Sequence, residues 1–200
     1  MVSGTFFFQT TAALQKEIGR GDRSMTLYVA RHGETDWNKS NRVLGRTDAP
    51  LNETGLAQAR ELVRALHGIS LRAVYTSPLR RAAEIGRMVA EDHGLISQTD
   101  ERLIEMDFGL LEGAQRDDPA YLAEKRKLFA RYPGGESYFE AAARVYSFLD
   151  ELKRAGGDGT VLVVTHNGIC RVAATYFMDM TEEEFMSYSM KNCEVRSFLL

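Results

Sequence analysis

Cysteine is scarce in this sequence. Cys170 and Cys193 are the only two among 200 residues, and they form no C-x-x-C pair. The pattern favours reduced thiols and a cytoplasmic location over a disulfide framework. Long apolar runs are also lacking, since none approaches the roughly 20 residues that a membrane span needs. The cluster Phe6-Phe7-Phe8 is too short for the core of a signal peptide and has no basic flank before it.

A strong excess of one charge is lacking as well. The sequence has 25 basic and 28 acidic residues, a formal net charge of −3. This balance gives no sign of a nucleic-acid or membrane partner. Any positively charged site must therefore be local and built from a few converging arginines. The hydrophobic fraction of 44% and the charged fraction of 26% are ordinary for a globular protein.

The length of the chain predicts one domain with a sizeable core, because two domains would be cramped in 200 residues. We expect this domain to cover residues 25–200. Residues 1–24 are interpreted as an N-terminal extension, disordered or non-native. A partly helical arm over residues 12–18, an expression remnant and a start codon placed too early all stay open.

Predicted strands alternate with predicted helices along the chain. The clearest buried strand is Thr160 to Thr165, which is apolar and β-branched. Such alternation is typical of an α/β protein, and we predict a three-layer α/β/α sandwich with a largely parallel central sheet. Strands are expected over residues 27–30, 71–75, 96–99, 160–165 and 195–200, and helices over 52–66, 79–92, 119–131, 137–154, 167–178 and 181–185.

Two helix starts and one buried face can be predicted in more detail. Asn52 is expected to be the N-cap of the first of these helices. The helix that starts at Ser137 should bury residues on or near one side, namely Phe139, Ala142, Ala143, Tyr146, Phe148 and Leu149.

A charged triplet follows the first predicted strand. Arg31-His32-Gly33 lies where an α/β sheet usually binds its ligand, just beyond the carboxyl end of a strand. Arg31 offers a planar fork of donors for phosphate or carboxylate oxygens. His32 is a candidate nucleophile or proton carrier. Gly33 lacks a Cβ, so we expect it to permit unusual dihedral angles and the close approach of a ligand.

The four histidines fall into two kinds. His67 and His93 precede glycines at predicted helix ends, where an imidazole usually contacts the last carbonyls, so we expect structural roles. His32 and His166 instead follow predicted strands and precede small turns. If both strands are central and parallel, these two imidazoles face one another across the carboxyl edge of the sheet.

A set of short motifs extends this pattern over most of the chain. The set resembles the histidine phosphatase superfamily, also called phosphoglycerate mutase-like, from about Met25 to Leu200. Its elements occur in the family's order: Arg31-His32-Gly33-Glu34-Thr35 with Trp37-Asn38; Gly45 to Ala59; Ser77-Pro78-Leu79-Arg80-Arg81-Ala82; Leu103 to Gly113; and Gly134-Gly135-Glu136-Ser137 followed by Val163-Val164-Thr165-His166.

The resemblance implies a catalytic set. Arg31, Arg81 and a protonated His166 would bind the phosphoryl group and balance its charge, in the role that metal ions fill elsewhere. His32 would attack phosphorus and carry the group as a phosphohistidine. Glu105 would protonate the leaving alkoxide and later take a proton from water, which requires a raised pKa.

Three further points follow from the resemblance. Asn38 would hydrogen-bond a phosphoryl oxygen. Asp107 and Glu112 are rivals of Glu105, which only the motif alignment favours. Asn167 stands where relatives often have glycine, so we expect the backbone amide there to be placed differently.

The function implied is metal-independent hydrolysis of a phosphomonoester on a small phosphorylated metabolite, without a cofactor. Mutases of the family carry an insertion after the proton-donor loop, and Gly113 to Gly134 is too short for it. A cofactor-dependent phosphoglycerate mutase remains the alternative within the family. A phospho-ligand binding protein without turnover is the alternative outside it. A metal hydrolase is weaker still, since the sequence has no H-E-x-x-H or His-x-His spacing.

Substrate selectivity is expected to come from residues over the pocket, between Gly113 and Gly134. Most polar side chains of the helix there should form a solvated basic face, while one or two contact a second anionic group. The sequence does not fix the physiological substrate or the oligomeric state, and a homodimer stays open. The side chains concerned are Tyr121, Lys125, Arg126, Lys127 and Arg131.

Overall fold

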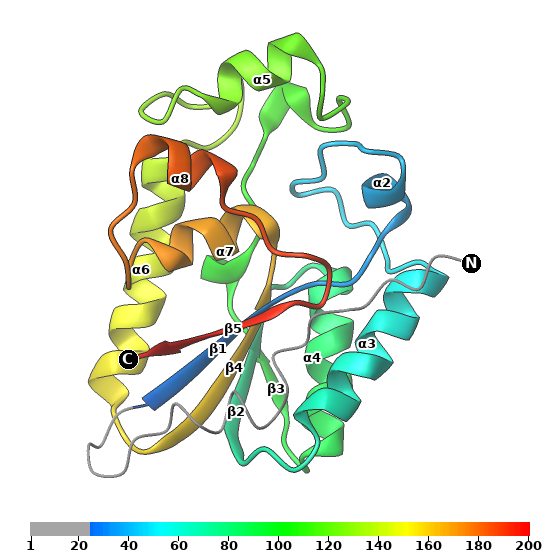
Figure 1. The fold of residues 1–200 in the computed structure, drawn as a ribbon, viewed down its shortest axis with the longest axis vertical. Coiled ribbons are helices and arrows are strands. Elements are labelled where there is room, and N and C mark those ends of the chain that lie inside the picture. Colours follow the sequence, from blue (N-terminus) through cyan, green and yellow to red (C-terminus); the bar gives the residue numbers. More distant parts are fainter. Residues whose placement is uncertain (1–24) are drawn as a thin grey trace.

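The fold is built on a five-stranded sheet with the strand order β3-β2-β4-β1-β5, seen in a computed structural model that describes residues 25–200 (Figure 1). β1 (Met25–Arg31) pairs in parallel with β4 (Gly159–Thr165), and β4 pairs in parallel with β2 (Leu71–Thr76). β3 (Ser97–Thr99) extends the parallel part, whereas β5 (Val195–Leu199) runs antiparallel to β1. The expected extension over residues 1–24 lies outside the described part.

The burial of the two central strands, β1 and β4, explains why their sequences are apolar runs. Six of the seven residues of β4 are buried, and so are six of the seven in β1. A strand with helices on both faces buries successive side chains in both directions, so its sequence is apolar without alternation. The register pairs Arg31 with Thr165, and the residues that follow the two strands therefore start side by side.

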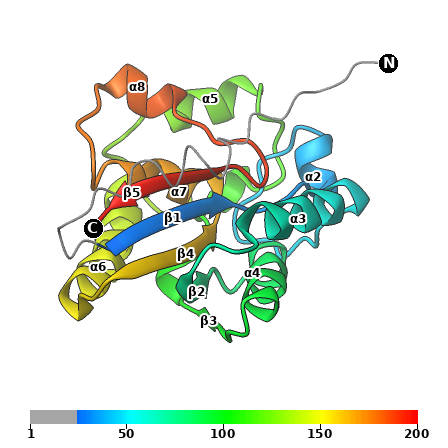
Figure 2. The same ribbon diagram turned by 60° about the horizontal axis from the view of Figure 1, so that its bottom comes forward.

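Helices cover both faces of the sheet (Figure 2). α6 (Tyr138–Ala155) and α7 (Asn167–Ala174) pack on one face, and α3 (Glu53–Leu66) and α4 (Arg80–Asp92) on the other. Each face has its own apolar cluster. The predicted three-layer α/β/α sandwich with a largely parallel sheet is confirmed.

Helix starts agree with the sequence signals. Asn52 caps α3, and its side chain accepts a hydrogen bond from the N–H of Gly55 at 2.9 Å. Ser137 caps α6 in a capping box with Glu140. Each cap satisfies backbone donors that the first helical turn leaves free. His93 contacts carbonyls at two helix ends, those of Val89 at 2.8 Å and Leu66 at 3.1 Å, in the expected structural role.

Two predicted helices are shorter in the structure. α5 (Pro119–Lys125) ends well before residue 131, because Tyr132 must leave the helix direction to reach the core, where its ring lies 5.0 Å from that of Phe108. α7 ends at Ala174 rather than near residue 178. There the Thr175 hydroxyl donates to the carbonyl of Val172 at 2.7 Å and competes with the next helical turn.

The buried face of α6 is also turned relative to the prediction. Phe148 and Leu149 are buried as expected, but Phe139 is 59% exposed and stacks on Phe129. The neighbouring Tyr138 takes the inward position instead, because its hydroxyl and ring fill the space between buried groups. The buried residues of α6 are Tyr138, Ala141, Val145, Phe148, Leu149 and Leu152.

Short elements gather at the carboxyl edge of the sheet. α2 (Asp36–Lys39), which the sequence analysis did not predict, follows β1 directly. α5 and α8 (Glu182–Ser187) lie near one another beyond that edge in both ribbon views. η1 (Glu101–Leu103) and η2 (Gly109–Leu111) are single 3₁₀ turns in the loop after β3.

None of the helices in residues 25–200 is long and apolar enough to cross a membrane.

One of the two reasons expected for a glycine at position 33, unusual dihedral angles, is wrong, while the close approach of a ligand stays a prediction. The φ of Gly33 is not among the positive values in the chain, so unusual dihedral angles are not the reason for a glycine. A Cβ on Gly33 would lie 2.7 Å from the carbonyl oxygen of Gly55, and a Cβ on Gly55 would lie 2.1 Å from the carbonyl oxygen of Glu34. The two glycines therefore let the first turn of α3 press against the loop that follows His32.

We predict that Gly55→Ala destabilises the protein by about 1–3 kcal/mol, because the added methyl group overlaps backbone atoms that cannot rotate away. Urea unfolding measures the change. Thr54→Ala, on the exposed side of the same turn, is the matched control and should stay within about 0.5 kcal/mol of wild type. Equal stability of the two variants would contradict the tight packing of α3 on this loop.

Candidate active site

Two imidazoles meet at the carboxyl edge of the sheet. The ring centroids of His32 and His166 lie 5.1 Å apart, and both side chains are almost fully buried. Each histidine directly follows one of the two central strands, and the N–H of His32 donates to the carbonyl of Thr165 at 2.9 Å. The juxtaposition predicted from the two strand ends is confirmed.

His32 has a defined orientation. Its Nδ1 lies 2.6 Å from the carbonyl oxygen of Gly33, which can only accept, so Nδ1 carries the proton and the lone pair is on Nε2. Burial holds the pKa of His32 well below its ordinary value of 6.5, with Arg81 and Arg31 acting in the same direction. The ring is therefore neutral and suited to nucleophilic attack through Nε2.

His166 is held from both sides. Arg81 Nε donates to its Nδ1 at 3.2 Å, and since arginine never accepts, the proton of a neutral ring sits on Nε2, which donates to Ser77 Oγ at 2.6 Å. Burial holds the pKa of His166 well below 6.5, and Arg81 and His32 lower it further. The protonated His166 expected from the resemblance is thus not the form that this arrangement favours.

Arg81 is fully buried without a carboxylate partner. Its Nη1 donates to the carbonyl of Thr47 at 2.8 Å and its Nη2 to that of Gly45 at 2.7 Å. Burial lowers its pKa to about 10. Glu112 in turn accepts from the N–H groups of Gly45 and Thr47 at 2.9 and 3.2 Å. Glu112 therefore holds the loop whose carbonyls bind the Arg81 guanidinium. The neighbouring Arg80 is exposed.

The guanidinium of Arg31 is buried, and its charge lowers the pKa of His32. Nη1 donates to the carbonyl of Met190 at 2.5 Å, while Nε has no hydrogen-bond partner. Among the side chains described, Tyr188 Oη is the only other buried nitrogen or oxygen without one. A buried donor without a partner is rare in native proteins and marks a place for an acceptor such as a phosphoryl oxygen.

Asn167 holds the segment that contacts Arg31. Its Oδ1 accepts from the N–H of Met190 at 2.9 Å and from the Ser189 hydroxyl at 3.2 Å. Because the carbonyl of Met190 accepts from Arg31, the side chain of Asn167 helps to place that guanidinium. A glycine at position 167 would have no such group.

Glu105 is the buried carboxyl of the site. It accepts from the N–H of Met106 at 2.9 Å and from that of Gly168 at 3.2 Å, and burial raises its pKa. A Cβ on Gly168 would lie 2.6 Å from Glu105 Oε1, so the glycine allows this approach. The two other acids considered for this role bind elsewhere. Asp107 accepts from the N–H of Gly109 at 2.9 Å, and Glu112 accepts from the N–H of Gly45.

Arg144 anchors the Glu105 loop, and sequence reasoning did not single it out. From α6 it forms two hydrogen bonds with Glu136, Nε to Oε1 at 2.8 Å and Nη2 to Oε2 at 2.9 Å. It also donates to the backbone carbonyls of Arg102 at 2.6 Å and Glu105 at 3.4 Å. The sequence signal that could have pointed to Arg144 was Glu136 of the Gly-Gly-Glu-Ser motif, because a buried acid requires a cationic partner.

Asn38 lies in α2, on the loop after His32. Its Oδ1 accepts from the N–H of Thr35 at 3.2 Å within the capping box of the helix. The amide Nδ2 keeps its two donors. The contact with a phosphoryl oxygen stays a prediction.

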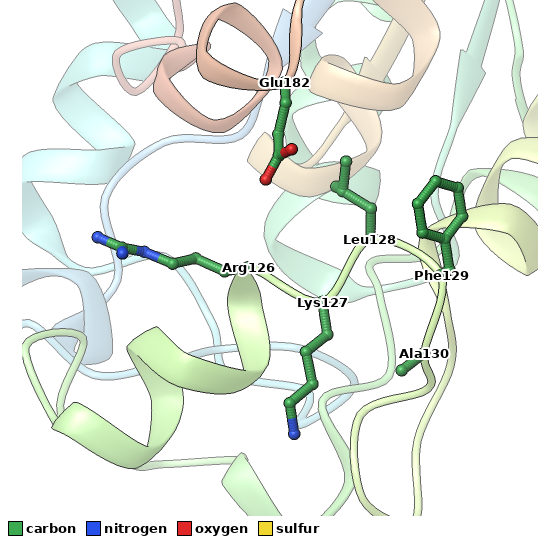
Figure 3. Close-up of a pocket in the computed structure, with 6 residues that line it drawn as sticks. All are labelled: Arg126, Lys127, Leu128, Phe129, Ala130 and Glu182. Carbon is green, nitrogen blue, oxygen red and sulfur yellow. The ribbon is translucent and has the colours of Figure 1, made fainter.

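Other regions offer less for catalysis. In the part of the chain that the structure describes, no three His, Cys, Asp or Glu side chains are grouped so that they could hold a metal ion. A cavity of about 310 Å³ lies between the segment after α5 and the start of α8, lined by Arg126 to Ala130 and Glu182, and it contains neither histidine (Figure 3).

Comparison with known proteins agrees with this geometry. A model of the histidine phosphatase superfamily (branch 1) matches residues 27–199. The probable phosphoglycerate mutase GpmB of Yersinia pestis (strain Pestoides F) is 28% identical over 178 residues, which cover 86% of this chain and 83% of that protein.

Solved structures have the same fold. The mycobacterial glucosyl-3-phosphoglycerate phosphatase superposes with a TM-score of 0.78 at 26% identity, over 87% of this chain and 89% of that one. A putative alpha-ribazole-5'-P phosphatase from Escherichia coli K-12 gives 0.78 at 28% identity, over 88% and 90%. Phosphatases and a probable mutase are thus both among the similar proteins.

We predict that Arg144→Met destabilises the protein by about 3 kcal/mol, because the buried Glu136 loses both hydrogen bonds to the guanidinium and keeps only Arg46, at 3.8 Å, as a cationic partner. Adding Glu136→Leu should recover much of this loss, which a double-mutant cycle of urea unfolding measures. Arg87→Met removes an exposed ion pair with Glu91 and should cost less than about 1 kcal/mol. Additive effects of the two buried substitutions would show that Arg144 and Glu136 do not act together.

Proposed function

The chain belongs to the histidine phosphatase superfamily (branch 1), and on this premise we propose that it hydrolyses phosphomonoesters through a phosphohistidine at His32. The substrate is a small phosphorylated metabolite, and neither a metal nor a cofactor takes part. We further propose that the protein acts in the cytoplasm, where the free thiols of Cys170 and Cys193 would stay reduced.

One observation above all supports the proposal: Nε2 of His32 carries no proton, and the charges of two arginines act on the same ring. The Gly33 carbonyl holds the Nδ1 proton, the ring of His166 lies 5.1 Å away, and the charges of Arg81 and Arg31 act on the same imidazole. A phosphoryl dianion fits such a site because it supplies the negative charge that Arg31 and Arg81 lack there.

Binding of a dianion would also change the protonation of His166. In the empty pocket burial and the arginines keep that ring neutral. A dianion beside it has the opposite effect and raises the pKa, so His166 would take up a proton as substrate binds. The cationic role expected for His166 is then a property of the complex.

The reaction would proceed in two steps. His32 Nε2 forms a bond to phosphorus while the bond to the ester oxygen breaks, and the proton of Glu105 goes to the leaving alkoxide. A water molecule then attacks the phosphohistidine, gives a proton to the Glu105 carboxylate and releases inorganic phosphate. Burial supports both roles, since it keeps a proton on Glu105 at a higher pH than usual.

Hydrolysis rather than phosphoryl transfer to a second hydroxyl is favoured by the segment over the pocket. Only η2, α5 and short turns connect Glu105 to Pro133. This segment is therefore shorter than the insertion expected in a mutase. The second candidate is a phosphoglycerate mutase, which one similar protein's name suggests. A phospho-ligand binding protein is disfavoured because nucleophile, acid and cations are all in place.

We predict that the purified protein releases phosphate from p-nitrophenyl phosphate and that EDTA does not change the rate. His32→Ala should lower kcat by at least about a thousandfold, because the neighbouring imidazole of His166 has both ring nitrogens engaged, by Arg81 and Ser77. Trapping with radiolabelled substrate and a quench in alkaline detergent, which preserves the acid-labile N–P bond, should give a phosphoprotein only with His32 present. Equal rates for wild type and His32→Ala would leave binding as the function.

The rate should depend on pH in two opposite ways. Phosphorylation needs neutral His32, whose pKa lies below 6.5, and protonated Glu105, whose pKa lies above 4.5, so kcat/KM falls at low pH through His32 and at high pH through Glu105. Glu105→Gln should lower kcat/KM for glycerol 3-phosphate by about 10²–10⁴-fold. The loss for p-nitrophenyl phosphate should be smaller, because p-nitrophenolate leaves without a proton. Equal losses for both esters would argue against Glu105 as the acid.

The mutase alternative has its own test. We expect no efficient interconversion of 2- and 3-phosphoglycerate, with or without 2,3-bisphosphoglycerate, while phosphate is released. Efficient interconversion together with inactivity on p-nitrophenyl phosphate would reverse the assignment.

A further inference from the structure

Ser77 is the first residue of the S-x-L-x-R-A motif, and the proposed reaction does not yet use it. Its side chain is fully buried just past the end of β2. Its N–H donates to the carbonyl of Val164 at 3.0 Å, so the contact of β2 with β4 continues one residue past Thr76. The carboxyl end of β4 thus lies between Ser77, at the end of one neighbouring strand, and His32, at the end of the other.

The Ser77 hydroxyl has two contacts. Its Oγ lies 2.6 Å from Nε2 of His166, and it accepts from the N–H of Leu79 at 3.3 Å. The N-cap of α4 is Leu79, which has no side-chain cap, so helix capping does not account for the serine. The backbone donor two residues ahead orients the hydroxyl. The imidazole is therefore its close partner.

The direction of the hydrogen bond to Ser77 is set from the other side of the ring. Arg81 Nε donates to Nδ1 of His166, and the carbonyls of Gly45 and Thr47 hold the two Nη atoms of the same guanidinium. Because Nδ1 accepts, Nε2–H of the ring donates to Ser77. A hydroxyl oxygen can accept from the N–H of a neutral or of a charged imidazole, so Ser77 is a partner for both forms.

A neutral acceptor at this place leaves the charge of His166 free to change. A carboxylate there would favour the charged ring and keep it protonated in the empty pocket. The buried acid of the site, Glu105, accepts from the N–H groups of Met106 and Gly168 instead of from the ring. The groups whose charges act on His166 all lower its pKa, and they come from α4, the end of β1 and α6: Arg81, His32, Arg144 and Arg31.

With Nε2–H bound to Ser77, a second proton on His166 has to enter at Nδ1. The partner of Nδ1 in the free protein is Arg81 Nε, which can donate but not accept. An oxygen of a bound dianion can accept from both nitrogens. It would replace the single contact between them by two charge-assisted hydrogen bonds, which are stronger than neutral ones.

We propose that Ser77 is a positioning residue of the phosphoryl site. Its hydroxyl holds Nε2–H of His166 in the neutral and the charged ring alike, and so directs the second proton to Nδ1, beside Arg81 Nε. The two nitrogens then donate together to the bound dianion. The inference rests on the proposed function of this pocket, but it concerns the binding of an anion and can be tested without turnover.

Nitrogen-15 NMR of the histidine rings tests this arrangement in the wild-type protein. Without ligand, His32 should carry its proton on Nδ1 and His166 on Nε2, which are opposite tautomers. Saturation with sulfate, a dianion that has no titratable proton near neutral pH, should protonate both nitrogens of His166. A bare Nε2 on His166 in the free protein would overturn the proposal. Failure of both sulfate and inorganic phosphate to bind would overturn the phosphoryl site itself, and the role of Ser77 with it.

Ser77→Ala tests the hydroxyl through the pH dependence of sulfate binding, measured by calorimetry. In wild type the affinity should fall by up to about tenfold per pH unit as the pH rises from the pKa of free His166, well below 6.5, to its higher value in the complex, because binding takes up a proton. Within this window Ser77→Ala should bind sulfate about tenfold more weakly, because the charged ring loses an acceptor. Above the pKa of the complex, where the ring stays neutral, the two proteins should bind sulfate equally.

Ser137→Ala is the matched control. Ser137 is also a buried serine at the start of a helix, but its hydroxyl contacts Glu140 and not a histidine. This variant should be less stable in urea and should keep the wild-type affinity for sulfate at every pH.

The pH dependence separates positioning from a merely structural role. A loss of sulfate affinity in Ser77→Ala that is the same at every pH, or no loss at any pH, would overturn the proposal. If Ser77→Ala does not fold, Ser77→Cys takes its place, because sulfur keeps the volume but is a weaker acceptor. It should show a smaller loss that also disappears above the pKa of the complex, and a constant loss would overturn the proposal in the same way.

Discussion

The parallel pairing of β1 with β4 is the constraint on which the site depends. Main-chain hydrogen bonds align Arg31 with Thr165, and the next residue on each strand is a histidine. Two imidazoles 134 positions apart in the chain therefore need no special contact to meet, since the sheet brings them together. A slip of one residue in this register would turn one ring to the other face of the sheet.

Around the histidines the protein stabilises buried cations with carbonyl oxygens instead of carboxylates. Gly45 and Thr47 hold Arg81, and Met190 holds Arg31. A carboxylate in these places would neutralise the guanidiniums and compete with a phosphate for them. The acids of the region act one step away, as Glu112 does on the loop that carries Gly45. The pocket is consequently rigid and remains positive.

Burial explains why His166 is neutral and why the pKa of Glu105 is raised, although two arginines lie nearby. Burial is the largest effect on both groups, and it removes charge from each of them. Burial thus favours the neutral imidazole and the protonated carboxyl, the two forms that the proposed mechanism needs when a phosphoryl dianion binds. Binding can then add a proton to one and chemistry can take a proton from the other, without a metal ion in either step.

Much was predictable from the sequence because it depends on local pattern. Apolar runs and caps determined the strands, the helix starts and the layer order, and the family resemblance pointed to Arg81. The turned face of α6 and the early end of α5 were missed, because both depend on how Tyr132 and Tyr138 pack against other elements. Glu105 was chosen among three acids from the motif resemblance alone, and only the structure supplies a physical reason, its burial.

The chain by itself thus determined the order of the elements and the types of residue at each strand end. Only the tertiary structure decided which protons and charges those residues carry. The contacts of Ser77 with His166, and of Arg144 with Glu136 and the Glu105 carbonyl, cannot be read from the linear pattern, since they depend on distances across the fold. Electrostatic and hydrogen-bond energies depend on separation and burial, and neither is fixed until the chain has packed.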